Sequence, residues 1–278
     1  MTGMPLTILR YAIIAVTIVL FVMLLIPVFE RRMVFHPVRY PHGNWAPEEF
    51  NLLVEDHFFE TEDGVSLHGW YARAEQPVGK TLLWAQGNAG NVSYRMQNMR
   101  LLLDWGIDVF IFDYRGYGKS ERATPTEAGI YADGRAAYDY LVGQLNIAPH
   151  DVVLFGRSLG STVMVDLALQ REAAALILES PLSNARDMAR QMVPVLPVHR
   201  LISIRLDSLA KIPAVEAPLL IIHGDQDTLI PIEQGRRLYD AAGEPKQFYV
   251  VRGAGHNDTF VVGGDAYFRM LRDFMTGL

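Results

Sequence analysis

The chain has 278 residues, 50% of them hydrophobic, a net charge of −6 and no cysteine. This length and apolar content suffice for one large domain with a well-filled core. The first forty residues hold four arginines and one glutamate, so the remainder carries 21 basic and 30 acidic residues, a charge of −9. Such a body lacks the basic face that binds nucleic acid, and the lack of cysteine excludes disulfides and thiolate metal sites.

The first predicted element is an apolar helix. Residues 11–29 contain no charge and lie between Arg10 and Glu30. As a helix they would span about 28 Å, close to the thickness of a hydrocarbon core. A secretory signal peptide is the competing interpretation, but the run is longer than a usual h-region and no small-residue cleavage site follows. A buried core helix is disfavoured because no polar face interrupts the run. We therefore predict an N-terminal transmembrane anchor, with its flanks, within residues 1–32.

One domain, residues 33–278, is expected to follow this anchor. Arg31, Arg32 and Arg39 outnumber Arg10 and the amino terminus, which favours a cytoplasmic domain by a margin of one or two charges. Residues 33–50 contain three prolines and are predicted to be irregular. The sequence contains no internal repeat, and it carries no signal for an oligomeric state.

The strand pattern predicts an α/β fold. Two β-rich runs flank Asp63-Gly64, a two-residue hairpin signal, so the sheet is expected to start antiparallel. Strands then alternate with helical segments, which predicts a mostly parallel central sheet with helices on both faces. The expected strands are residues 52–61, 65–74, 81–85, 109–112, 152–155, 175–178, 219–222 and 247–251.

Two helix starts are marked by capping residues. Asn91 is expected to cap a helix that runs to about Trp105 and stops at Gly106. Residues 124–127, Thr-Pro-Thr-Glu, fit a capping box with Pro125 at the first helical position.

A Gly-x-Ser-x-Gly stretch, residues 156–160, follows the apolar strand 152–155 and opens into a helical segment at 161–170. This strand-turn-helix context is the one that a nucleophile elbow requires. Its glycines let neighbouring backbone pass close to a sharp turn that carries Ser158. The role of Arg157, next to that serine, is not indicated by the sequence.

Two further polar loops follow later strands. The loop after residues 219–222 holds Asp225 and Asp227, and the loop after 247–251 holds His256. In a parallel sheet these loops meet at the carboxyl edge, where ligands bind. The order serine, aspartate, histidine is that of the α/β-hydrolase triad, with either aspartate as the acid on residue positions alone.

At these residues the chain resembles the α/β-hydrolase superfamily, and within it the BEM46-like serine hydrolases. The resemblance covers roughly residues 33–278. Its motifs are Gln-Gly-Asn-Ala-Gly-Asn at 86–91, Asp-Tyr-Arg-Gly-Tyr-Gly-Lys-Ser at 113–120, the elbow at 156–160, Asp-Ser-Leu-Ala-Lys-Ile at 207–212, His-Gly-Asp-Gln-Asp at 223–227 and Gly-His at 255–256.

The resemblance implies a role for each site residue. Ser158 would be the nucleophile, His256 the general base, and Asp227, four residues after the strand-terminal His223, the orienting acid. His223 itself is expected to be structural, and Asp258 to fix loop geometry or face solvent.

An oxyanion hole is expected from two backbone NH groups, those of Leu159 and Asn88. The chain departs from the family at Gln86, where a histidine is usual. Gln86 should preserve the hole if its side chain holds the loop by a hydrogen bond.

Other signals fail on inspection. Residues 118–120 end like a phosphate-binding P-loop, but the required glycine five positions earlier is Asp113. Asp113 and Arg115 are expected to stabilise a turn. The remaining histidines lack the spacing of a metal site, so we predict neither a metal nor a cofactor.

About 35 residues, roughly 181–215, separate two strands and are predicted to form a small lid insert. Its apolar residues fit either a lid over an acyl pocket or ordinary core packing: Met188, Met192, Val193, Val195, Leu196 and Val198. We predict a membrane-anchored serine hydrolase that cleaves small-molecule or lipid acyl esters or thioesters through an acyl-enzyme. A serine peptidase and a catalytically silent membrane-tethered interaction module are the alternatives.

Overall fold

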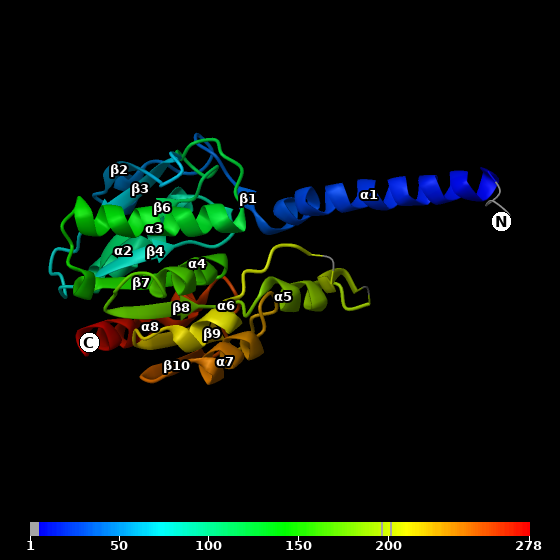
Figure 1. Cartoon of the computed structure of the whole chain (residues 1–278). Coiled ribbons are helices and arrows are strands. Elements are labelled where there is room, and N and C mark those ends of the chain that lie inside the picture. The colour runs from blue at the N-terminus through cyan, green and yellow to red at the C-terminus, as the bar shows by residue number, and fades with distance from the viewer. Residues whose placement is uncertain (1–5, 196, 201) are drawn as a thin grey trace.

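Eight strands form the central sheet of the computed structural model, which describes residues 6–195, 197–200 and 202–278 (Figure 1). Their order across the sheet is β10-β9-β8-β7-β4-β6-β3-β2. The bounds are β2 Glu55–Glu60, β3 Ser66–Ala72, β4 Thr81–Ala85, β6 Asp108–Asp113, β7 Val152–Arg157, β8 Ala175–Glu179, β9 Leu219–Gly224 and β10 Lys246–Val251. Two further strands, β1 His36–Pro37 and β5 Ala89–Gly90, pair in parallel as a separate small sheet.

The sheet has the predicted mixed character. β2 and β3 form the expected antiparallel hairpin, but the last pair in register is Glu60 with Ser66, so the loop is longer than the predicted two residues; Gly64 within it takes a φ of 77°, which favours glycine. β3 also pairs antiparallel with β6, whereas the pairs from β6 through β4, β7, β8 and β9 to β10 are all parallel. The carboxyl ends of β7, β9 and β10 therefore lie at one edge of the sheet.

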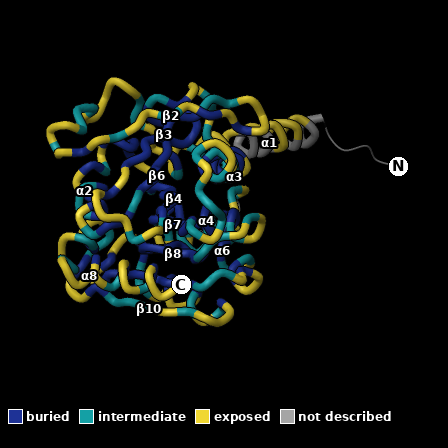
Figure 2. Tube along the Cα trace, turned by 90° about the vertical axis from the view of Figure 1, so that its left-hand side faces the viewer, coloured by how far each residue is buried: buried dark blue, intermediate teal, exposed yellow. Residues whose placement is uncertain are grey.

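Helices cover both faces of the sheet. Figure 2 shows α2 and α8 on one side of the strands and α3, α4 and α6 on the other. Alternate residues of β4 serve the two cores: Leu83 packs toward one, and Leu82 and Trp84 toward the other. The bounds are α2 Met96–Asp104, α3 Glu127–Gly143, α4 Leu159–Ala168, α5 Ala185–Met192, α6 Ser208–Lys211, α7 Ile232–Ala241 and α8 Thr259–Thr276.

One of the two predicted helix starts needs correction. The Asn91 side chain caps as expected, although the first turn, Val92–Arg95, is 3₁₀ and α2 follows it. The cap of α3 is Thr126, which accepts from the amide of Gly129, and not Thr124. Glu127 does not close a capping box, because its carboxylate accepts hydrogen bonds from the amides of residues 205 and 206.

The predicted N-terminal helix is α1, Leu6–Val34, which projects away from the domain (Figure 1). Tyr11, Phe21 and Phe29 on it are each more than 60% exposed. In the part of the chain that the structure describes, no helix combines the length and apolar character needed to cross a membrane. The transmembrane anchor therefore has no support from the structure and stays a prediction.

The base of α1 is docked onto the domain. Glu30 is 6% exposed, and its carboxylate accepts hydrogen bonds from the amide and hydroxyl of Ser203, at 2.7 and 2.6 Å. Ser203 belongs to the predicted lid insert, so the end of α1 and the insert are held together.

The insert contains α5, a 3₁₀ turn at Pro197–Arg200, and α6. Its apolar residues divide between the two predicted roles, which are core packing and a lid. Met188 packs against the core, whereas Met192 and Val195 are 56% and 89% exposed. Leu196 lies outside the described residues.

Candidate active site

Three loops at the carboxyl edge of the sheet bring the predicted triad together. Ser158 follows β7, Asp227 follows β9 and His256 follows β10. The His256 Nε2 atom lies 3.0 Å from the Ser158 hydroxyl oxygen, and its Nδ1 atom lies 2.7 Å from Asp227 Oδ2. One imidazole thus bridges a hydroxyl and a carboxylate from opposite sides.

The turn that carries Ser158 is strained and depends on its glycines. Ser158 has φ 53° and ψ −119°, a conformation that side-chain-bearing residues rarely adopt. A Cβ atom on Gly160 would lie 2.0 Å from the carbonyl oxygen of Ala85, and one on Gly156 would lie 2.5 Å from that of Gly160. Only glycine allows the strand, turn and helix to pass this closely, which is the geometry expected of the elbow.

Asp227 is held in its ionised form. Its Oδ1 atom accepts hydrogen bonds from the amides of Leu229 and Ile230, at 3.0 and 2.8 Å. Burial alone would raise the pKa of this carboxyl, but hydrogen bonds from His223, His256 and the Ile230 amide hold the pKa below its usual range. An ionised carboxylate is what fixes the tautomer of a facing imidazole and stabilises its cation.

The competing residues have other partners. Asp225 accepts a hydrogen bond from the amide of Gly253 at 2.7 Å, and Asp258 accepts one from the amide of Gly255 at 2.7 Å. Both carboxylates therefore brace the loop that carries His256. Buried His223 donates from Nε2 to the carbonyl of Ile230 at 2.8 Å, as expected of a structural strand-end residue.

The predicted oxyanion donors lie on two segments next to Ser158. Leu159 is the first residue of α4, where amides lack helical acceptors. In the other segment a Cβ atom on Gly87 would lie 3.6 Å from Ser158 Cβ, so the loop passes beside the serine. Asn88 is fixed there because its carbonyl accepts from the amide of His36 at 3.0 Å and from the hydroxyl of Tyr117 at 2.8 Å. Their role as donors stays a prediction.

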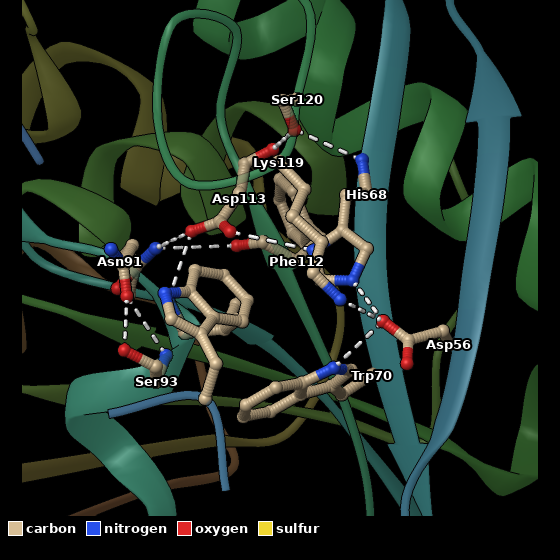
Figure 3. Close-up of polar contacts among 12 residues, drawn as sticks. Asp56, His68, Trp70, Asn91, Ser93, Phe112, Asp113, Lys119 and Ser120 are labelled. Carbon is tan, nitrogen blue, oxygen red and sulfur yellow. Dashed lines mark hydrogen bonds and ion pairs between the residues drawn. The ribbon is translucent and has the colours of Figure 1, made fainter. Parts of the chain in front are cut away.

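The Gln86 side chain holds this loop by a hydrogen bond, as expected from the sequence. Its side chain is fully buried and donates to Asp113 Oδ1 at 2.9 Å. The same carboxylate oxygen accepts from the amide of Val92 at 2.9 Å. Asp113 also faces His68, whose Nε2 atom lies 2.7 Å from Asp56 (Figure 3). Asp113 was expected to stabilise a turn. The structure shows that it also belongs to a buried polar cluster with Gln86 and His68, and that this cluster supports the loop beside Ser158.

Sequence reasoning left Arg157 without a function. The structure buries its guanidinium between Glu179 and the loop of His256. The available signal was a charged residue placed at the end of an otherwise apolar buried strand, since such a charge needs a partner.

Across the described residues, no three histidine, aspartate or glutamate side chains gather as a metal site requires.

The comparisons with known proteins agree with this geometry. Residues 78–209 match the family described as serine aminopeptidase, S33. The chain is 31% identical to Bem46 of Schizosaccharomyces pombe over 265 residues, which cover 89% of this chain and 86% of that protein. The chain belongs to the α/β-hydrolase family.

Other relatives of this α/β-hydrolase cover similar lengths. An uncharacterized protein of Mycobacterium tuberculosis strain H37Rv is 38% identical over 89% of this chain and 87% of its own. The α/β-hydrolase domain-containing protein WAV2 of Arabidopsis thaliana is 31% identical over 90% and 89%. An esterase of Pyrococcus furiosus has the same fold, with a TM-score of 0.72 and 23% identity over 88% of this chain and 98% of that one.

Proposed function

We propose that this α/β-hydrolase is a serine hydrolase that cleaves carboxylic esters or thioesters through an acyl-enzyme on Ser158. One observation carries the proposal: His256 lies within hydrogen-bonding distance of the Ser158 hydroxyl on one side and of the Asp227 carboxylate on the other. A serine hydroxyl is a weak nucleophile at neutral pH, and this arrangement supplies the base that it needs.

The proposed reaction has two halves. The Ser158 oxygen attacks the acyl carbon while its proton passes to His256 Nε2, and the amides of Leu159 and Asn88 bind the resulting oxyanion. His256 then returns the proton to the departing alcohol or thiol, leaving the acyl group on Ser158. In the second half, water gives a proton to His256 and attacks the acyl group. As the intermediate collapses, His256 returns that proton to the Ser158 oxygen, the carboxylic acid is released and the serine hydroxyl is restored.

A fluorophosphonate probe tests this proposal directly. The intact protein should be labelled, and Ser158→Ala should abolish labelling and lower ester hydrolysis by roughly 10⁴-fold or more. The control is Ser120→Ala, which removes another buried serine outside the three loops. An unlabelled intact protein, or equal labelling of the Ser158 variant, would leave the silent interaction module as the better interpretation.

A peptidase is the second candidate, favoured by the match of residues 78–209 to the serine aminopeptidase family. The same triad cleaves both bond types, so the discrimination comes from matched substrates. Hydrolysis of p-nitrophenyl esters with no turnover of the corresponding aminoacyl p-nitroanilides would support the esterase. The reverse preference would support the peptidase.

The insert at residues 181–215 supports the proposal of an acyl substrate. The side chain of Gln191 on α5 reaches the carbonyl of Leu229, in the loop of Asp227. Met192 directly follows Gln191 in the chain, Val195 follows three residues later, and both are exposed. We expect kcat/KM to rise with acyl chain length, and Met192→Lys/Val195→Lys to remove that rise. Equal rates for short and long acyl esters in the unaltered protein would contradict an acyl groove.

We propose that α1 anchors the domain to a membrane. The support is its uncharged stretch and its exposed Tyr11, Phe21 and Phe29. The full chain should stay with membranes during alkaline carbonate extraction, and Ile14→Asp/Phe21→Asp should release it. Protection from protease in sealed vesicles would report the side of the domain, for which a cytoplasmic position is expected. Release of the unaltered chain by carbonate would contradict the single-pass anchor.

A further inference from the structure

Arg157 connects the serine turn to the histidine loop. It stands directly before Ser158 and is 6% exposed. Its Nη2 atom donates to the backbone carbonyl of His256 at 3.0 Å and to the side-chain oxygen of Asn257 at 3.2 Å. The residue next to the proposed nucleophile thus holds the backbone of the proposed base.

Glu179 completes this connection. It ends β8, pairs in register with Arg157 on β7, and is fully buried. Its Oε1 atom lies 3.0 Å from Arg157 Nε and accepts a hydrogen bond from the hydroxyl of Thr259 at 2.8 Å. Its Oε2 atom accepts from the hydroxyl of Tyr267. Both hydroxyls belong to α8, which begins just after the loop of His256, so the ion pair fixes that loop from two directions.

The loop needs such a restraint because of its composition. Gly253 and Gly255 flank Ala254 immediately before His256, and Gly253 has a φ of 81°. Glycine gives a loop more backbone freedom than any other residue. General-base catalysis depends on the distance between imidazole and hydroxyl, which here is 3.0 Å. A shift of about 1 Å in such a contact can cost roughly 10²-fold in rate.

We propose that Arg157 and Glu179 form a positioning pair that sets the His256 imidazole against Ser158. This inference rests on the proposed hydrolase function and assigns the pair no contact with substrate. Disturbing the pair should therefore lower kcat and the labelling rate of Ser158 while leaving KM nearly unchanged.

Two substitutions separate positioning from folding. Arg157→Lys keeps the charge, but one ammonium does not reproduce the planar guanidinium that contacts Glu179 through Nε and His256 through Nη2. Arg157→Met/Glu179→Gln removes both charges, so no unpaired ion is left buried and the protein should fold. We expect both variants to unfold near the temperature of the unaltered protein and to lose roughly 10- to 100-fold in kcat.

Arg115→Lys is the matched control. Arg115 is also 6% exposed and contacts a fully buried carboxylate, that of Asp133, at 2.8 Å. Its hydrogen bonds in the described residues go to Asp63 and Asp133, and neither residue lies on the three loops that carry Ser158, Asp227 and His256. This variant should keep kcat, whatever its effect on unfolding temperature.

A proton NMR signature gives a readout that a change in stability alone would not move. The Nδ1 proton of His256, bonded to Asp227, should give a downfield signal that shifts or broadens in the Arg157 variants and persists in Arg115→Lys. An unchanged signal with unchanged kcat in folded Arg157→Lys and Arg157→Met/Glu179→Gln would overturn the positioning role. Failure of fluorophosphonate to label the unaltered protein would instead overturn the hydrolase proposal, so the two failures are distinguishable.

Discussion

Two histidines, the partly buried His256 and the fully buried His68, each face a carboxylate at 2.7 Å, and they differ in what lies on the other side of the ring. His256 meets the Ser158 hydroxyl at 3.0 Å. His68 meets a second carboxylate, Asp113, at 3.5 Å, and its side chain is fully buried (Figure 3). A histidine between a carboxylate and a hydroxyl can take the hydroxyl proton, whereas His68 faces carboxylates on both sides and has no hydroxyl to activate. The comparison shows that an aspartate-histidine contact does not by itself mark a catalytic base.

The backbone beneath each histidine differs as well. His68 lies inside β3, where the sheet hydrogen bonds fix it. His256 lies on a glycine-containing loop that is held by side chains, those of Asp225, Asp258 and Arg157. On a loop, the position of the imidazole depends on side-chain contacts and not on the sheet. Such a position suits the proposed role of His256, which is to take up and return a proton.

The largest expected effect breaks the carboxylate contact of His256. Asp227→Asn should lower kcat by roughly 10⁴-fold, because an amide no longer fixes the imidazole tautomer or stabilises its cation. Steady-state hydrolysis of a p-nitrophenyl ester measures the loss. Asp225→Asn is the control and should retain most activity, since the amide oxygen of asparagine can still accept the hydrogen bond from the Gly253 amide that braces the loop of His256. Equal losses in both variants would contradict the assignment of Asp227.

Removing His68 should change stability instead. His68→Leu removes the imidazole that faces the buried Asp113 carboxylate and should lower the free energy of unfolding by about 3 kcal/mol, because a buried polar group then loses a partner. The folded variant should keep kcat, because Asp113 still accepts from Gln86 and Val92. Urea unfolding and ester hydrolysis measure the two effects. The double variant His68→Leu/Asp113→Asn should recover much of the stability, and a kcat loss like that of Asp227→Asn would erase the distinction between the histidines.

Gln86 joins the two regions, so its substitution should have an intermediate effect. Gln86→Leu removes the bond from the loop beside Ser158 to Asp113. We expect kcat to fall about 10-fold, less than the 10²- to 10³-fold typical of losing an oxyanion donor, because the backbone amides remain. Gln86→His, the usual family residue, should restore activity if it bonds Asp113. An unchanged kcat in Gln86→Leu would mean that other contacts suffice to hold the loop.

The smallest expected effect concerns Asp56, the more exposed of the two carboxylates that face His68. Burial opposes ionisation here, but hydrogen bonds from Lys119 and His68 lower the pKa of Asp56 to about 2. Because the folded-state pKa is depressed, the contribution is present above the unfolded pKa of about 4 and is lost as the pH falls toward 2. The urea midpoint should therefore fall less steeply between about pH 4 and pH 2 in Asp56→Asn. Identical slopes would contradict a role for this carboxylate.

Much of the fold could be predicted from local patterns. The eight strands of the central sheet, the Asp63-Gly64 hairpin and the helix after Asn91 follow from residue types over a few positions. The start of α3 was predicted wrongly, because Glu127 is used by a segment almost eighty residues later in the chain. Contacts of that separation leave no trace in a local pattern.

The candidate site shows the same division. Sequence order and the glycines of residues 156–160 predicted that a serine, an aspartate and a histidine meet at one edge of the sheet, because parallel strands align their carboxyl ends, but residue positions alone left Asp225 and Asp227 as alternatives. Tertiary structure alone decided the partners of Arg157 and the docking of Glu30 on Ser203. The physical reason is that strand-end positions follow from the chain itself, whereas the partner of a buried charge is chosen by whichever distant group packing brings within hydrogen-bonding distance.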